Sequence, residues 1–158
     1  MSSSSNNYKS KSINHFVEDM PTTYFVGNAA VPLAEMTSIQ KMHIVKSGIS
    51  KKYLENLKKS TSLDYDSLAE ALSVTRSTLI NKKGNEKFSD QISEKIIALA
   101  DLYSFGYEIF ENQTRFNNWM TAPNQALGGV APLSIIDNVY GREEVRNLIG
   151  RIAYGVYS

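Results

Sequence analysis

The chain has no cysteine and only two histidines, His15 and His43, among its 158 residues. Without cysteine, a disulfide scaffold, a cysteine-containing zinc site and a thiol nucleophile are excluded. A three-histidine metal site is excluded too, and a Ser-His-Asp triad would need one of these two histidines. No phosphate-binding loop, nucleophile elbow, His-Glu-x-x-His pattern or dinucleotide-binding glycine pattern occurs. These gaps favour a binding protein over an enzyme, with no metal and no cofactor.

Long apolar runs are also missing. No segment approaches the roughly 18 apolar residues that span a membrane, and the Ser- and Asn-rich start lacks the pattern of a signal peptide. Apolar residues make up 42% and charged residues 21% of the chain, as in average globular proteins. We therefore expect a cytoplasmic protein of one domain or two small ones, with no membrane partner.

The net charge of +1 hides an uneven distribution. Residues 41–87 hold 10 basic and 5 acidic side chains, whereas residues 1–40 hold 2 and 3, and residues 88–158 hold 5 and 8. A basic block between acidic ones is typical of a protein whose middle contacts a polyanion such as DNA.

Residues 1–12 are too poor in apolar side chains to form a core, and we expect them to be disordered. Residues 13–47 form an N-terminal extension to which we assign no role. Pro21, Gly27 and Pro32 interrupt its pattern, which allows a short strand at 24–26 and a short helix over 35–46.

Beyond residue 48 the pattern is helical. Capping residues and apolar spacing predict helices after Ser50, over 65–72, over 76–83 up to Gly84, from Ser89 to about Phe110, over 115–120, over 133–139 up to Gly141, and over 142–156. No useful strand pattern follows residue 30, so the predicted fold class is all-α.

Residues 65–83 fit a helix-turn-helix, the simplest DNA-reading module. Its inward positions hold Leu68, Ala69, Leu72, Val74 and Leu79, and Ser73 stands where the turn usually has glycine. The candidate DNA-binding residues on the outward face are Arg76, Ser77, Thr78, Asn81, Lys82 and Lys83. The alternative is a pair of packed helices with a solvated polar face.

Different side chains of this face suit different parts of DNA. Arg76 and Asn81 carry guanidinium and amide groups, which can bond bidentately to guanine and adenine edges. Phosphate contacts are expected from the lysines, namely Lys82 and Lys83 together with Lys51, Lys52, Lys58 and Lys59. One such helix binds weakly, so we expect a homodimer on a repeated half-site.

The C-terminal third carries a patterned string: a Trp, a Pro-Asn pair, a Leu-Gly-Gly triplet, a Pro-Leu pair and a final amphipathic helix. The residues on this pattern are Trp119, Pro123, Asn124, Leu127, Gly128, Gly129, Pro132, Leu133, Asp137, Gly141, Val145, Leu148, Arg151 and Gly155. The string resembles the C-terminal toxin-binding domain of the Xre/MbcA/ParS-like antitoxins. Residues 48–50 and 63–80 resemble the Xre-like half more loosely, and the first 47 residues lie outside the resemblance.

The resemblance implies a bacterial type II antitoxin. Members of the family neutralise a RES-domain toxin, an NAD⁺-degrading enzyme encoded by the neighbouring gene, by covering its active-site cleft. They also commonly repress their own operon by binding operator DNA. On this basis residues 48–98 would be the Xre-like DNA-binding domain and residues 99–158 the toxin-binding domain.

The chain end suggests how a toxin could be bound. We expect Arg151, Tyr154, Tyr157 and Ser158 to be toxin-binding residues, with the terminal carboxylate of Ser158 standing where a dinucleotide phosphate would sit. The alternative is that the two tyrosines only seal the helix end. The remaining motif residues have expected structural roles: Trp119 as a core anchor, Gly128 and Gly129 in a tight turn, and Pro123, Pro132 and Gly141 in shaping the chain.

Two further functions are compatible with the same residues. The chain could be a stand-alone transcriptional regulator whose C-terminal domain only dimerises. It could also be a toxin inhibitor that no longer binds an operator.

Overall fold

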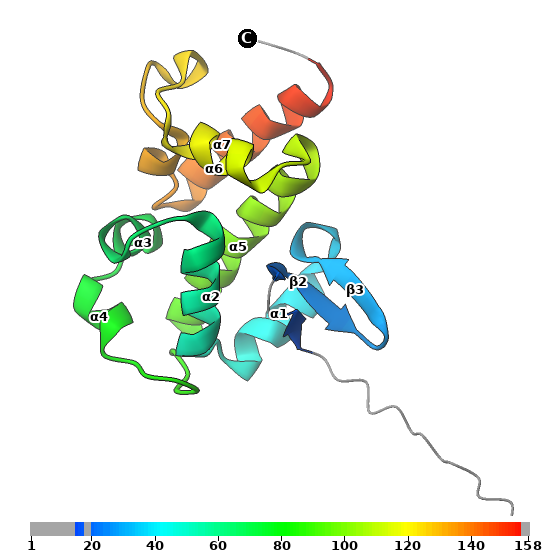
Figure 1. Cartoon of the computed structure of the whole chain (residues 1–158), viewed down its shortest axis with the longest axis vertical. Helices are drawn as coiled ribbons and strands as arrows, with labels where there is room; N and C mark the ends of the chain where they lie inside the picture. Colours follow the sequence, from blue (N-terminus) through cyan, green and yellow to red (C-terminus); the bar gives the residue numbers. More distant parts are fainter. Residues whose placement is uncertain (1–14, 18–19, 156–158) are drawn as a thin grey trace, which may run out of the picture.

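Residues 15–17 and 20–155 are described by a computed structural model (Figure 1). Residues 1–12, which were expected to be disordered, lie outside this part. So do the candidate residues Tyr157 and Ser158. In chain order, with η for a 3-10 helix, the elements are β1 (Phe16–Val17), β2 (Met20–Val26), β3 (Ala29–Pro32), η1 (Leu33–Glu35), α1 (Ser38–Ser47), α2 (Lys51–Thr61), α3 (Tyr65–Leu72), α4 (Arg76–Ile80), α5 (Asp90–Phe110), α6 (Gln113–Thr121), η2 (Gln125–Leu127), η3 (Pro132–Ile135) and α7 (Val139–Ala153).

The longest helix, α5, lies at the centre of the fold. It packs against α1, α2, α3, α6 and α7, and Figure 1 shows it in the middle of these helices, with α6 and α7 toward one end. Ile96, Ala100 and Tyr103 on α5 are fully buried, at the spacing that keeps side chains on one helix face. The boundary predicted at residues 98–99 falls within α5, so one continuous helix joins the two halves of the chain.

A second connection between the halves is a set of hydrogen bonds at the end of α2. The Tyr107 hydroxyl on α5 donates to Asn117 Oδ1 on α6 at 2.8 Å. The Asn117 amide in turn donates to the main-chain carbonyl of Ser60 at 2.9 Å. These bonds satisfy polar groups that are partly buried, as polar groups away from water require.

The N-terminal extension forms a three-stranded antiparallel sheet in the order β1-β2-β3. Gly27, with φ +63°, lies in the turn between β2 and β3, and Tyr24 pairs with Val31. The sequence indicated only a short strand here, because Pro21 and Pro32 suggested interruption. Both prolines lie near strand ends, where a missing N–H group is tolerated.

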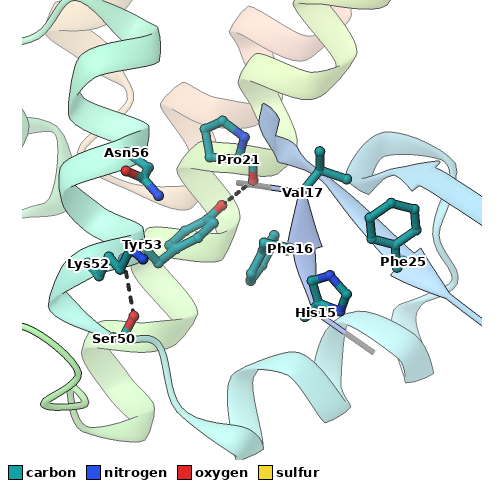
Figure 2. Close-up of a pocket in the computed structure, with 9 residues that line it drawn as sticks. All are labelled: His15, Phe16, Val17, Pro21, Phe25, Ser50, Lys52, Tyr53 and Asn56. Carbon is teal, nitrogen blue, oxygen red and sulfur yellow. Dashed lines mark hydrogen bonds between the residues drawn. The ribbon is translucent and has the colours of Figure 1, made fainter. Parts of the chain in front are cut away.

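Tyr53 attaches this sheet to α2 (Figure 2). Its hydroxyl donates to the carbonyl of Pro21 at 2.6 Å, and its ring packs on Phe16 with centroids 4.0 Å apart. Burial raises the pKa of the Tyr53 hydroxyl above its ordinary value, so the group remains a neutral donor. The sheet therefore packs on the helices as part of the same fold. The rest of the described chain is mainly helical, as predicted.

The helix predicted over residues 76–83 is wrong in its length, because α4 ends at Ile80. The chain that follows is bound to the start of α2 instead. Lys52 N donates to the carbonyl of Gly84 at 2.9 Å, and Phe88 N donates to the carbonyl of Ile49 at 2.8 Å. Because residues 84–88 make these hydrogen bonds with a distant segment, they do not continue the helix.

The predicted boundaries in the last third are also corrected. The helix expected over 133–139 is the 3-10 helix η3, and α7 spans Val139–Ala153 rather than 142–156. Gly141 lies inside α7 and does not end a helix. Asn138 caps α7 by accepting a hydrogen bond from Gly141 N at 3.0 Å, and a Cβ on Gly141 would lie 1.5 Å from the carbonyl oxygen of Ile135.

Candidate functional site

The helices α3 and α4 form the predicted helix-turn-helix. Leu68 of α3 and Leu79 of α4 are fully buried, and they hold the two helices on the core. Ser73 ends α3 in the left-handed conformation with φ +54°, the conformation that glycine adopts most easily. The next residue, Val74, donates its N–H to the carbonyl of Ala69 at 3.0 Å, so the serine still makes a compact turn.

The beginning of α3 is capped by Asp64, whose carboxylate accepts a hydrogen bond from Ser67 N at 2.7 Å. This hydrogen bond, with a smaller effect of the Lys58 and Arg76 charges, lowers the pKa of the Asp64 carboxyl below its ordinary value. The cap is therefore charged under physiological conditions, as the positive end of a helix favours.

The six candidate DNA-binding residues lie on α4 and in the loop that follows. The exposed ones are Arg76, Ser77, Asn81 and Lys83, whereas Thr78 and Lys82 are half-buried. The Thr78 hydroxyl lies 2.7 Å from the hydroxyl of Thr75 and lines a groove of about 540 Å³ that reaches Arg142 of α7. Thr78 thus lies at a groove whose other lining residues are mostly on α5.

Arg76 makes an ion pair with Asp66 of α3, with Nη1 3.2 Å from Oδ1. The two side chains are 58% and 73% exposed. Exposed pairs of this kind contribute little stability, because water and salt screen them. The guanidinium group can therefore exchange Asp66 for another acceptor, such as a base edge.

Lys51, expected at a phosphate, is instead buried, with 3% of its surface exposed. Its ammonium group donates a hydrogen bond to the main-chain carbonyl of Leu79 and lies 4.8 Å from the centre of the Tyr65 ring. The Lys58 ammonium lies over the same ring at 4.9 Å. A buried ammonium needs such partners, so the phosphate contact predicted for Lys51 is wrong and its role is structural.

The loop after α4, which includes Lys83 and Lys87, lies next to the start of α2. Lys51 N donates to the carbonyl of Glu86 at 2.9 Å, and Ser50 forms an isolated antiparallel bridge with Lys87. Lys52 and Lys83 are both exposed beside this junction. The tertiary fold thus gathers basic residues that lie about thirty positions apart in the sequence.

In the C-terminal half, the Pro/Gly segment turns around Asn124. Gly128 and Gly129 both have positive φ, +72° and +90°, and Gly129 N donates to the carbonyl of Asn124 at 2.8 Å. Trp119 is half-buried and stacks on Phe116 with ring centroids 5.8 Å apart. Of the two prolines, Pro132 is buried and Pro123 is exposed.

The last helix, α7, presents an exposed face with a tyrosine at each end. Tyr140 and Tyr154 are 80% and 87% exposed. The opposite face packs on α5 through Val145, Leu148 and Ile149. Tyr140 was not among the predicted site residues, because the helix was expected to begin only at residue 142.

The candidate toxin-binding residues Arg151 and Tyr154 lie on this exposed face. Arg151 approaches Glu144 at 3.9 Å, a long and exposed pair. The Tyr154 ring is almost fully solvated, so it does not cover the core here. Tyr157 and Ser158 lie outside the described residues, and the participation of all four stays a prediction.

Within residues 15–17 and 20–155, no three His, Asp or Glu side chains are grouped so that they could hold a metal ion. In the same part of the chain, none of the helices has the length and apolar character needed to cross a membrane.

Two family models match the chain. The Antitoxin Xre-like helix-turn-helix domain matches residues 42–101, and the Antitoxin Xre/MbcA/ParS C-terminal toxin-binding domain matches residues 106–155. The matches therefore divide the chain within α5, and the sheet of residues 16–32 precedes both.

Individual relatives agree with these matches. A Sphingobium sp. (strain YBL2) protein named Prs ADP-ribosylating antitoxin is 23% identical over 137 residues, covering 80% of this chain and 86% of the relative. A protein of Photorhabdus laumondii named Antitoxin Xre is 33% identical over 76 residues, 48% of this chain and 51% of its own. Another Antitoxin Xre, from Yersinia enterocolitica, is 24% identical over 116 residues, covering 72% and 78%.

Proposed function

Because this chain belongs to the Xre/MbcA/ParS-like antitoxins, we propose that it neutralises a RES-type, NAD⁺-degrading toxin by covering the toxin's active site. We propose further that it represses its own operon by binding operator DNA. Both activities place the protein in the bacterial cytoplasm, where NAD⁺ and the operator are found.

The exposed face of α7 carries the toxin-binding part of the proposal. This helix lies in the segment matched by the toxin-binding domain, and its two tyrosines are 80% and 87% exposed. Solvated aromatic rings are common anchors of protein interfaces, since they bury a large area at low cost in conformational entropy. In this proposal Arg151 and Tyr154 contact the toxin, and Tyr157 and Ser158 enter the cleft.

The proposed contact lies at the substrate site of the toxin. An enzyme that binds NAD⁺ needs cationic or N–H donors for the pyrophosphate. An antitoxin that covers these donors would compete directly with the substrate. Inhibition would then weaken when the NAD⁺ concentration is raised.

The DNA-binding part rests on the surface formed by α4 and the loop after it. Arg76, Asn81 and Lys83 are exposed there. A helix of five residues contacts only a few base pairs, so an operator would need two copies of the module at a fixed spacing. A homodimer that binds two half-sites is therefore part of the proposal.

The experiment that tests the toxin target measures NAD⁺ in cells. The adjoining gene is induced with and without this chain, and NAD⁺ is quantified along with growth. We expect NAD⁺ to collapse with the adjoining gene alone and to recover when this chain is co-expressed. If the adjoining gene leaves NAD⁺ and growth unchanged, the RES-type target is wrong.

A second toxin chemistry is suggested by the name of the Sphingobium relative, which refers to ADP-ribosylation of Prs. The same cell samples, probed for ADP-ribose attached to protein, distinguish the two chemistries. Modified protein that disappears on co-expression, with NAD⁺ largely preserved, would favour a toxin that modifies a protein over one that degrades NAD⁺.

Operator binding is tested by a gel shift on the promoter upstream of the gene. Affinity should fall steeply as salt rises, because contacts with phosphates release counterions. Absence of a shift at low salt would leave the chain as a toxin inhibitor without a repressor role.

A further inference from the structure

Gly150 occupies the interior of α7, where no contact among the described residues calls for a glycine. Glycine destabilises a helix interior relative to alanine, because it loses more conformational freedom. A Cβ on Gly150 would meet no heavy atom within 4 Å, so nothing in the described part of the chain requires glycine here.

Two other helical glycines show the contrast. A Cβ on Gly106 of α5 would lie 2.1 Å from the Phe116 ring, and one on Gly141 of α7 would lie 1.5 Å from the carbonyl oxygen of Ile135. Both glycines are therefore required by close packing inside the protein. Gly150 is also a glycine inside a helix, but a Cβ at this position would point into open space.

The open space above Gly150 is part of a groove of about 550 Å³ between α5 and α7. It is lined by Phe105, Arg146, Asn147, Gly150, Arg151 and Tyr154. The Arg146 guanidinium lies 4.7 Å from the centre of the Phe105 ring, so one wall is aromatic with a basic edge. Tyr154, which is 87% exposed, stands at the opposite end.

Helical periodicity places Gly150 on the side of α7 that borders the groove, where it is half-buried. Glu143, Asn147 and Gly150 follow one another at spacings of four and three, and Tyr154 follows at the end of the helix, so all four lie on one side. With no side chain at position 150, the main chain of α7 is accessible between Asn147 and Tyr154.

The charges around the groove favour an acidic partner. Arg146 approaches Asp101 at 3.7 Å, but the same Asp101 oxygen lies closer to Lys41, at 3.1 Å. Arg151 has only the long contact with Glu144 at 3.9 Å. Three cations thus share two carboxylates, and the two arginines can each accept a further carboxylate.

We propose that the toxin packs its main chain directly against α7 at Gly150, with a bulky apolar side chain beside Phe105 and Tyr154 and a carboxylate toward Arg151. This inference rests on the proposed function, because the occupant is the neutralised toxin. It adds the contact point and its chemistry. All lining residues of the groove except Phe105 lie in the segment matched by the toxin-binding domain, which favours the toxin over a second copy of this chain.

The test uses the full chain and the purified RES-type toxin encoded beside it. Gly150→Ala should raise the Tm of the free antitoxin by about 2–4 °C, since alanine favours the helix. The same variant should bind the toxin at least about tenfold more weakly, because its methyl group keeps the partner away from the helix. Gly150→Leu should weaken binding further.

Glu55→Leu, at an exposed position of α2, is the matched control for an added leucine and should bind the toxin like the wild type. Circular dichroism and binding to the upstream promoter check that each variant is folded. If Gly150 had a purely intramolecular role, Gly150→Ala would not make the free antitoxin more stable while weakening its binding to the toxin.

Toxin affinity within twofold of wild type for both Gly150 variants would overturn the inference. So would a variant that changes the oligomeric state of the free chain while toxin affinity is retained, because a second copy would then occupy the groove. If the wild-type chain itself fails to bind the toxin, the proposed function fails and this inference with it.

Discussion

The ammonium group of Lys51, in the first turn of α2, donates a hydrogen bond to the main-chain carbonyl of Leu79 near the end of α4. A buried lysine thereby satisfies a carbonyl at the end of a helix only five residues long. Such carbonyls lack a partner within their own helix. The orientation of the proposed DNA-binding surface therefore depends on a residue that does not itself face solvent.

Replacing this lysine should destabilise the fold. Lys51→Met keeps most of the apolar stem but leaves the Leu79 carbonyl buried without its donor, and we expect a loss of about 1–3 kcal/mol in the free energy of unfolding. Urea denaturation measures this loss. Lys59→Met, at an exposed position of the same helix, is the control. Equal stability of the two variants would contradict the structural role of Lys51.

Arg76 and Lys82 should affect DNA binding in different ways. Arg76→Ala should relax the preference for the operator, because a guanidinium group that contacts a base edge distinguishes bases by about 1–3 kcal/mol. Lys82→Ala should weaken all sequences alike and lower the slope of log affinity against log salt by about one. Competition gel shifts at several salt concentrations separate the two effects. An unchanged operator preference in Arg76→Ala would place the reading surface elsewhere.

The chain end should matter for the toxin and not for DNA. Deleting Tyr157 and Ser158 is expected to abolish or strongly reduce toxin inhibition, because both residues are proposed to enter the cleft. Promoter binding should be retained, since these residues lie far along the chain from α4. An NAD⁺ consumption assay with purified toxin is the measurement. Full inhibition by the truncated chain would show that the tail does not enter the active site.

Two buried tyrosines should respond in opposite directions to loss of their hydroxyl groups. The Tyr103 hydroxyl has no hydrogen-bond partner among the described residues, so Tyr103→Phe should leave stability unchanged or raise it by about 1 kcal/mol. Tyr53→Phe loses the hydrogen bond to Pro21 and should be destabilised by about the same amount. Thermal denaturation of both variants gives the comparison. Marked destabilisation of Tyr103→Phe would indicate a partner such as bound water.

Gly141 and Gly150 should differ sharply when each is changed to alanine. Gly141→Ala forces a methyl group against the carbonyl of Ile135, and we expect a loss of about 1–3 kcal/mol or more from overpacking. Gly150→Ala should stabilise the free protein. Parallel denaturation curves test this contrast between two positions of one helix. Similar stabilities would mean that η3 moves aside without cost.

Much of the helical fold could be predicted from short stretches of sequence. Helices were expected to begin after Ser50 and at Ser89, and each serine accepts a hydrogen bond from the main-chain N–H three residues later. The predicted bounds of α3 and the end of α5 at Phe110 are confirmed. Caps and apolar spacing act within a few residues, so they depend little on the rest of the molecule. The helix-turn-helix spacing was identifiable for the same reason, whereas the toxin-binding domain was identified by its resemblance to a known family.

Other features depend on contacts between distant segments. The end of α4 is set by pairing of residues 84–88 with the start of α2, and the N-terminal sheet by strands whose partners the local pattern does not identify. The burial of Lys51 depends on where the Leu79 carbonyl and the Tyr65 ring come to lie. Local sequence patterns therefore determined which helices form. Tertiary packing determined which lysine is buried and which face of α7 is exposed, because burial is a property of the assembled core.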